Sequence, residues 1–179
     1  MITNFDYLKN ESKFSRFADV AISAEKIILM DPEASIINSR RAMEFAIKWM
    51  YSVDSELEMP YQDNLQSLMN AEDYRQIVGQ DLWKRMDYIR RCGNNVAHSN
   101  KKFGRDEAML CLENLFIYLD FISYCYSDQY EEHSFDKTII TSRIEKAKES
   151  KEIANATRAE LVKEQEKSAK QELDLRKLM

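Results

Sequence analysis

Glycine and proline are scarce in this sequence, which contains three Gly and two Pro among 179 residues. Average usage would supply several times as many. Sheets and hairpins need these residues at their turns, so their scarcity favours helices. Because 44% of the residues are apolar, the chain can also bury a core. We therefore predict an all-α fold.

Apolar residues recur at helical spacing through most of the chain before residue 127. This spacing predicts four long helices, at about 14–30, 32–51, 82–98 and 106–124. Two short helical pieces are expected between the second and the third, at about 64–70 and 71–78, and Gly79 would end them. The fourth long helix is apolar on nearly all sides, so we expect it to be central. Residues 1–130 are thus predicted to form one compact helical bundle.

The chain changes character after a polar stretch, and from residue 136 onward it has no Gly, Pro or Trp. Apolar or small residues recur there every seven positions, at Ile140, Ala147, Ala154, Leu161, Ser168 and Leu175. Their companion positions are mostly polar, whereas a coiled coil needs both sets apolar. Pairs of opposite charge three or four residues apart support a helix, and they include Glu145–Lys148, Glu164–Lys167 and Glu172–Arg176. We predict that residues 131–179 form a linker and a long charged helix, either a spacer or a weak coiled coil, and that the natural chain continues into another domain.

Charge and cysteine content exclude several classes of protein. The formal net charge is −5, and residues 1–135 hold 15 Lys and Arg against 22 Asp and Glu, so nucleic acid is not generally attracted. Three cysteines without a CxxC pair argue against a disulfide framework or a zinc site, and Cys111 and Cys125 are expected in the core. Neither a signal peptide nor an apolar run of membrane length is evident, so we expect a cytoplasmic protein without a membrane partner.

The stretch from Tyr88 to His98 is the least ordinary part of the sequence. Arg91 and His98 lie seven residues apart, which is two helical turns, and so share one face with Asn94 and Asn95 between them. Arginine and asparagine side chains offer donors to a phosphate, and a histidine can act as a general base in RNA cleavage. Under this hypothesis Arg91 and His98 are catalytic.

A structural interpretation explains the same residues. Gly93 would let another element approach closely, an Asn side chain would tie a loop, and His98 would interact with the helix C-terminus. Arg40 and Arg41, on the second helix, could join Arg91 in a basic binding site or belong to a solvated, ion-paired face. The second histidine, His133, lies in a polar loop and is expected at the surface.

Motifs for other chemistry are missing. The sequence contains no Gly-rich phosphate loop followed by Lys-Ser/Thr, no nucleophile elbow and no HExxH. The carboxylates are spread along helix faces, with no predicted strands to gather them around Mg²⁺. We therefore predict no metal site and no cofactor in this segment.

Several motifs resemble the extreme N-terminus of the restriction (R) subunits of type I restriction–modification enzymes. The resemblance covers about residues 4–130. The similar stretches are Asn4–Leu8, Phe17–Ala21, Ala24–Lys26, Ser39–Glu44, Lys48–Tyr51, Pro60–Leu65, Gly93–Asn100, Glu107–Ala108 and Asn114–Phe116. The region also resembles HEPN-like helical domains, whose hallmark is an Arg, four to six residues and then a His. Arg91 and His98 fit with six residues between, although active ribonucleases of that kind place a polar residue where this chain has Cys92.

The first resemblance implies an accessory interaction module that precedes a DNA-cleaving domain and an ATP-driven translocase. ATP and Mg²⁺ would then serve only those downstream domains. The partners would be other subunits or domains of the restriction complex, with DNA contacted indirectly, and the role would be defence against foreign DNA such as phage. The second resemblance implies an RNA-cleaving or nucleotide-binding domain that pairs two copies of the Arg91 and His98 set across a homodimer.

Overall fold

The computed structural model describes residues 2–99 and 101–178, and these residues form an all-α structure. Within them lie six α-helices and two short 3-10 helices, and no strand occurs in these ranges. The 3-10 helices are η1 (Asp6–Asn10) and η2 (Ser12–Phe14). The α-helices are α1 (Ser15–Ile27), α2 (Pro32–Val53), α3 (Leu65–Asn70), α4 (Glu72–His98), α5 (Arg105–Tyr126) and α6 (Thr138–Leu178). The predicted all-α class is confirmed.

The chain divides into two units, residues 1–136 and residues 137–179. The second unit is the 41-residue helix α6, in which every residue from 145 to 170 is exposed. Within that range the structure records no ion pair shorter than 4.0 Å, so the expected pairs such as Glu145–Lys148 and Glu164–Lys167 do not form. Glu172 and Arg176, also expected to pair, lie where side chains are not described.

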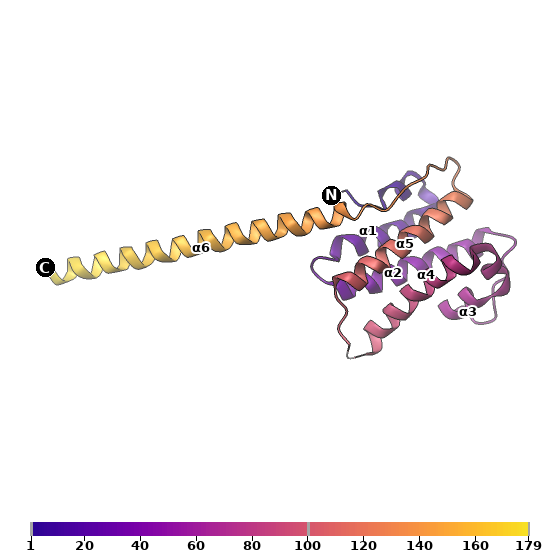
Figure 1. Ribbon diagram of the computed structural model, residues 1–179, viewed down its shortest axis with the longest axis horizontal. Helices are drawn as coiled ribbons and strands as arrows, with labels where there is room; N and C mark the ends of the chain where they lie inside the picture. Colours follow the sequence, from indigo (N-terminus) through magenta and orange to yellow (C-terminus); the bar gives the residue numbers. More distant parts are fainter. Residues whose placement is uncertain (1, 100, 179) are drawn as a thin grey trace. The chain divides into compact units, whose positions relative to one another are not determined.

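Four helices, α1, α2, α4 and α5, make the core of the first unit (Figure 1). Helix α2 lies beside α1 and also packs against α4 and α5, while the short α3 lies against α4. The start of α2 forms as predicted, because the Asp31 carboxylate accepts a hydrogen bond from the Ala34 N–H at 2.9 Å and Pro32 occupies the first turn. The bundle predicted from the sequence is therefore present.

At Gly79 the observed helices differ from the predicted ones. It has φ +73° and ψ 168°, a conformation that side chains beyond glycine rarely adopt. The predicted piece at 71–78 and the third long helix are thus joined in α4, which is kinked at this residue. The predicted break was placed correctly, but the chain bends there instead of forming a separate loop.

Helix α5 is central, as its composition predicts. Leu112, Leu115, Tyr118 and Leu119 are fully buried, and the Tyr118 hydroxyl lies 2.9 Å from the Tyr74 hydroxyl of α4. By length and composition alone α5 could span a membrane, contrary to the expectation that no such run exists. However, 56% of its most apolar window is buried inside the unit, a pattern that the core helix of a soluble protein shares.

A segment that we name the strap, residues 127–136, follows α5 and is bound to the N-terminal segment. Asn4 Nδ2 donates to the Asp136 carbonyl at 3.2 Å, and the Asp136 N–H donates to Asn4 Oδ1 at 2.7 Å. At the other end, Glu11 accepts hydrogen bonds from the Ser127 hydroxyl and from the Asp128 N–H. The strap therefore belongs to the compact unit, whose boundary falls at residue 136 rather than 130.

Candidate functional site

The first candidate site is the C-terminal part of α4, where Arg91 and His98 are both exposed. The Arg91 side chain is 63% exposed, and its Nε lies 2.9 Å from Asp87 Oδ2, one turn towards the helix N-terminus. Arg90 also binds this carboxylate, with Nε 2.9 Å and Nη2 2.7 Å from Asp87 Oδ1. Arg91 thus extends away from His98. At 1.5 Å rise per residue the two positions are roughly 10 Å apart along the axis.

Cys92 and Gly93 face the opposite way, into the core. The Cys92 thiol shares a hydrogen bond with Cys111 of α5, and this bond, with contributions from Tyr88 and Arg91, lowers the pKa of Cys92 to about 7. The pKa of Cys111 is raised, first by the same hydrogen bond and then by burial. Cys92 is therefore a core residue and not part of the exposed polar face.

Gly93 allows a close approach by Arg40 of α2. A Cβ at Gly93 would lie 2.4 Å from Arg40 Cδ and 2.9 Å from Arg40 Cβ, closer than real Cβ atoms come. The close-approach interpretation of Gly93 is thus correct, with a side chain of α2 as the neighbour. The contact also buries Arg40 Nε, which has no hydrogen-bond partner in the described part of the chain.

Arg40 and Arg41 have different neighbours in the structure. Arg40 Nη1 lies 3.8 Å from Glu44 Oε2, and Lys48 Nζ lies 3.0 Å from Glu44 Oε1, so this side of α2 is ion-paired. Arg41 instead lies over the Phe45 ring, with its guanidinium carbon 5.4 Å from the ring centroid. Arg16 of α1 lies over the same ring at 4.5 Å. The two arginines therefore serve different sides of α2.

The asparagine side chains of the proposed site make fewer hydrogen bonds than the structural interpretation predicts. Asn94 is half-buried and Asn95 is exposed, and neither side chain makes a recorded hydrogen bond within residues 2–99 and 101–178. The helix C-terminus is closed by the backbone, since the Ser99 N–H donates to the Asn95 carbonyl at 2.8 Å. The loop-tying role predicted for these amides is thus not observed, and Asn100 lies outside the described residues.

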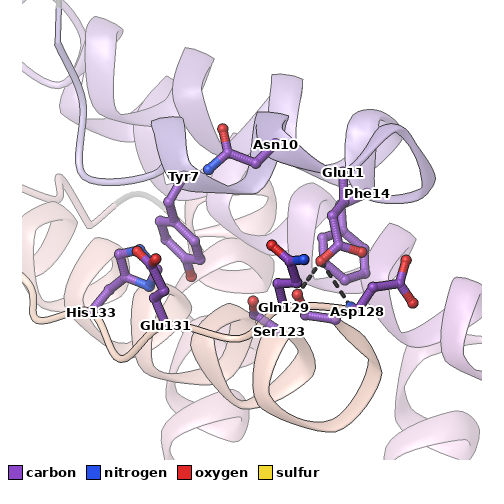
Figure 2. A pocket seen from close by; sticks show the side chains of 10 residues that line it. Tyr7, Asn10, Glu11, Phe14, Ser123, Asp128, Gln129, Glu131 and His133 are labelled. Carbon is purple, nitrogen blue, oxygen red and sulfur yellow. Dashed lines mark hydrogen bonds between the residues drawn. The ribbon is translucent and has the colours of Figure 1, made fainter.

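The second candidate site is a cavity of about 450 Å³ between the N-terminal segment and the strap (Figure 2). Carboxylates, uncharged polar groups and aromatic rings share its wall. The lining residues are Tyr7, Asn10, Glu11, Phe14, Ser123, Ser127, Asp128, Gln129, Glu131 and His133. Figure 2 shows Tyr7 reaching from the N-terminal segment towards His133, with Glu11 and Asp128 on the other side of the cavity.

Tyr7 and His133 form one end of this cavity. Their rings are stacked with centroids 4.1 Å apart. Behind them, Asp120 of α5 accepts a hydrogen bond from the Tyr130 hydroxyl at 3.0 Å through Oδ2, and its Oδ1 lies 3.6 Å from His133 Nδ1. Burial raises the pKa of Asp120, and burial together with the Asp120 charge raises the pKa of Tyr7. Tyr7 Oη, Asp120 Oδ1 and His133 Nδ1 are buried with no hydrogen-bond partner among the described residues.

This cavity was not predicted from the sequence. His133 was expected at the surface, but it is half-buried and stacked on a residue 126 positions earlier in the chain. No local pattern links Tyr7, Asp120 and His133, because the strap brings them together. Cys125 was expected in the core, but it is exposed, since it lies on the outer side of the last turn of α5. Within the described residues, no group of three His, Cys, Asp or Glu is placed to hold a metal ion.

Comparisons with protein-family models, with curated proteins and with solved structures gave no match.

Proposed function

We propose that this chain is a non-catalytic interaction module, the N-terminal part of a type I restriction R subunit. The observation that carries the proposal is the contact between Arg40 and Gly93. These residues belong to two separate stretches of the resemblance, Ser39–Glu44 and Gly93–Asn100, which lie about 50 positions apart in sequence and meet in the core between α2 and α4. Two motifs that fit against each other support a shared fold better than either motif alone.

The surface for such an interaction would lie over α1 and α2. Arg16 and Arg41 are exposed and flank one Phe45 ring, and neither has a carboxylate within 4.0 Å in the part of the chain that is described. A guanidinium held over a ring loses less side-chain freedom on binding and still offers its donors to a carboxylate or phosphate. Partner residues with acidic side chains would fit this surface.

The test measures binding of the 179-residue chain to the cognate methyltransferase complex, together with restriction of unmodified DNA in cells. Arg41→Glu is expected to weaken binding about tenfold or more, because it reverses one exposed charge in the interface. Arg158→Glu, the same change on the exposed surface of α6, is the matched control and should leave binding unchanged. If the unaltered chain neither binds the complex nor is needed for restriction, the proposal is wrong.

A second candidate is the HEPN-type function, which the exposure of both Arg91 and His98 on one side of α4 favours. A composite site in a homodimer would need one residue from each copy, because within one chain Arg91 is bound to Asp87 and points away from His98. His98→Ala and Arg91→Ala should then abolish RNA cleavage by a dimer while leaving the dimer intact. A monomer in solution, or RNA decay unaffected by both variants, rejects this candidate.

A further inference from the structure

The cavity under the strap combines features of a binding site that the interaction proposal does not use. It is concave, it has the rings of Tyr7 and Phe14 in its wall, and it contains a buried polar atom without a partner among the described residues, Tyr7 Oη. His133 Nδ1 and Asp120 Oδ1, beside it, lie 3.6 Å from each other. An unsatisfied buried polar atom is destabilising, and a bound group that completes the hydrogen bonding of the Tyr7 hydroxyl would remove that cost.

The charges on the cavity wall define which group fits. Three of the lining residues are carboxylates, Glu11, Asp128 and Glu131, and Lys13, which does not line the cavity, is paired with the first two. Near the other end, Asp120 adds a carboxylate behind the wall, 3.6 Å from His133 Nδ1. The end with Glu131 therefore disfavours anions and favours a cation that donates hydrogen bonds. The rings of Tyr7 and Phe14 add apolar surface for a short aliphatic chain.

At one end of the cavity, the two carboxylates of the wall already bind an ammonium group of the chain itself, although this lysine does not line the cavity. Lys13 Nζ lies 2.8 Å from Glu11 Oε2 and 3.3 Å from Asp128 Oδ1. The opposite end, with Tyr7, Glu131 and His133, has a comparable set of acceptors but no such cation. Glu131 has no ion pair within 4.0 Å among the described residues.

We propose that the end of the cavity formed by Tyr7, Glu131 and His133 binds the primary ammonium group of an alkylamine or of a lysine side chain. The ammonium would donate hydrogen bonds to the Glu131 carboxylate and to Tyr7 Oη, and Asp120 would supply a second negative charge. The alkyl stem would lie along the ring of Phe14. Binding at this place would also join the strap to the N-terminal segment, because the two sides of the cavity come from these two parts of the chain.

The test is isothermal titration calorimetry of the 179-residue chain with n-butylamine, and with 1-butanol as a neutral probe of the same shape. We expect butylamine to bind at millimolar or lower concentration and butanol to bind at least tenfold more weakly, the change expected when a charge-assisted hydrogen bond is lost. A tetrapeptide with one central lysine distinguishes the two sources of the ammonium. Tighter binding of the peptide assigns the site to a protein side chain, and binding of butylamine alone assigns it to a free amine.

Two variants locate the binding. Glu131→Gln should weaken butylamine binding about tenfold, whereas Glu149→Gln, the same charge change on the exposed surface of α6, should not. Tyr7→Phe keeps the stacked ring and removes only the hydroxyl, so it should weaken binding without unfolding the chain, and circular dichroism verifies the fold. Absence of amine binding, equal binding of butanol, or equal effects of Glu131→Gln and Glu149→Gln would overturn the proposal.

Discussion

Helices α5 and α6 share one secondary structure but form for different reasons. Helix α5 has 22 residues and is lined with buried side chains such as Leu115 and Ile122, while α6 has 41 residues and is exposed throughout 145–170. A buried helix is stabilised mainly by tertiary packing, whereas an exposed helix depends on local propensity. Helix length in this chain therefore says little about where the stability lies.

The same substitution in the two helices should have the largest and most unequal effect. Leu115→Ala removes a fully buried side chain from α5 and should lower the free energy of unfolding by about 2–5 kcal/mol. Leu161→Ala in α6 removes a side chain that is 55% exposed and should change the free energy of unfolding by less than about 0.5 kcal/mol. Urea denaturation measures both. A comparable loss for Leu161→Ala would mean that α6 packs against a partner, for example in a coiled coil.

Replacement of glycine by alanine should change the free energy of unfolding in opposite directions in the compact unit and in an exposed helix. Gly→Ala ordinarily stabilises an exposed helix by up to about 1 kcal/mol. Gly93→Ala should instead destabilise the unit by about 1–3 kcal/mol, because the new Cβ overlaps the Arg40 side chain. Thermal or urea unfolding tests this. The double variant with Arg40→Ala serves as the control, since removal of the long side chain should abolish most of the loss.

The hydrogen bonds between Glu11 and the strap should depend on pH, whereas the helical structure of α6 should not. Burial opposes ionisation of Glu11, but hydrogen bonds from Lys13, Ser127 and Asp128 outweigh it and lower the pKa of Glu11 below its ordinary value. A lowered carboxyl pKa stabilises the folded state above the unfolded pKa of about 4.3, and this contribution is lost as the pH falls through the folded value.

Hydrogen exchange of amides 127–130 measures this effect. Their protection should fall as the pH is lowered below about 4.3, after correction for the intrinsic exchange rate. Glu11→Gln should remove the pH dependence, and Glu149→Gln on α6 should preserve it. Unchanged pH dependence in Glu11→Gln would show that another group controls the strap.

Salt should have the smallest effect. Pairs of opposite charge three or four residues apart contribute about 0.2–0.5 kcal/mol each when they form. Because the structure records no ion pair within residues 145–170 of α6, added salt should change its helical content, followed by far-UV circular dichroism, only slightly. A marked loss of helix with salt would show that these pairs form in solution.

The sequence was informative wherever a local pattern decides the structure. The Asp31–Pro32 start of α2, the bend at Gly79 and the buried position of α5 all follow from capping, backbone freedom and hydrophobic periodicity. The inward orientation of Gly93 was also among the predicted interpretations. These features depend on residues within one or two helical turns of each other.

The rest depends on contacts between distant segments. Tyr7, Asp120 and His133 come from the N-terminal segment, α5 and the strap, and no periodicity relates them. The sequence did not indicate that Cys125 is exposed. Because α5 is apolar on most sides, polar residues do not mark its outer face near the last turn. Likewise, Asp87 sets the orientation of Arg91 by pairing with it. The spacing between Arg91 and His98 in the sequence does not reveal this pair.

The paired hydrogen bonds between Asn4 and Asp136 have a mechanical consequence. They join the first and the last described parts of the compact unit across 132 residues, at 2.7 and 3.2 Å. Tension applied to the chain at Asp136 would be borne partly by these two bonds, which tie the end of the strap to the N-terminal segment and not to a core helix. Their rupture would free only the last residues of the strap, because Glu11 still binds its first residues and His133 stays stacked on Tyr7.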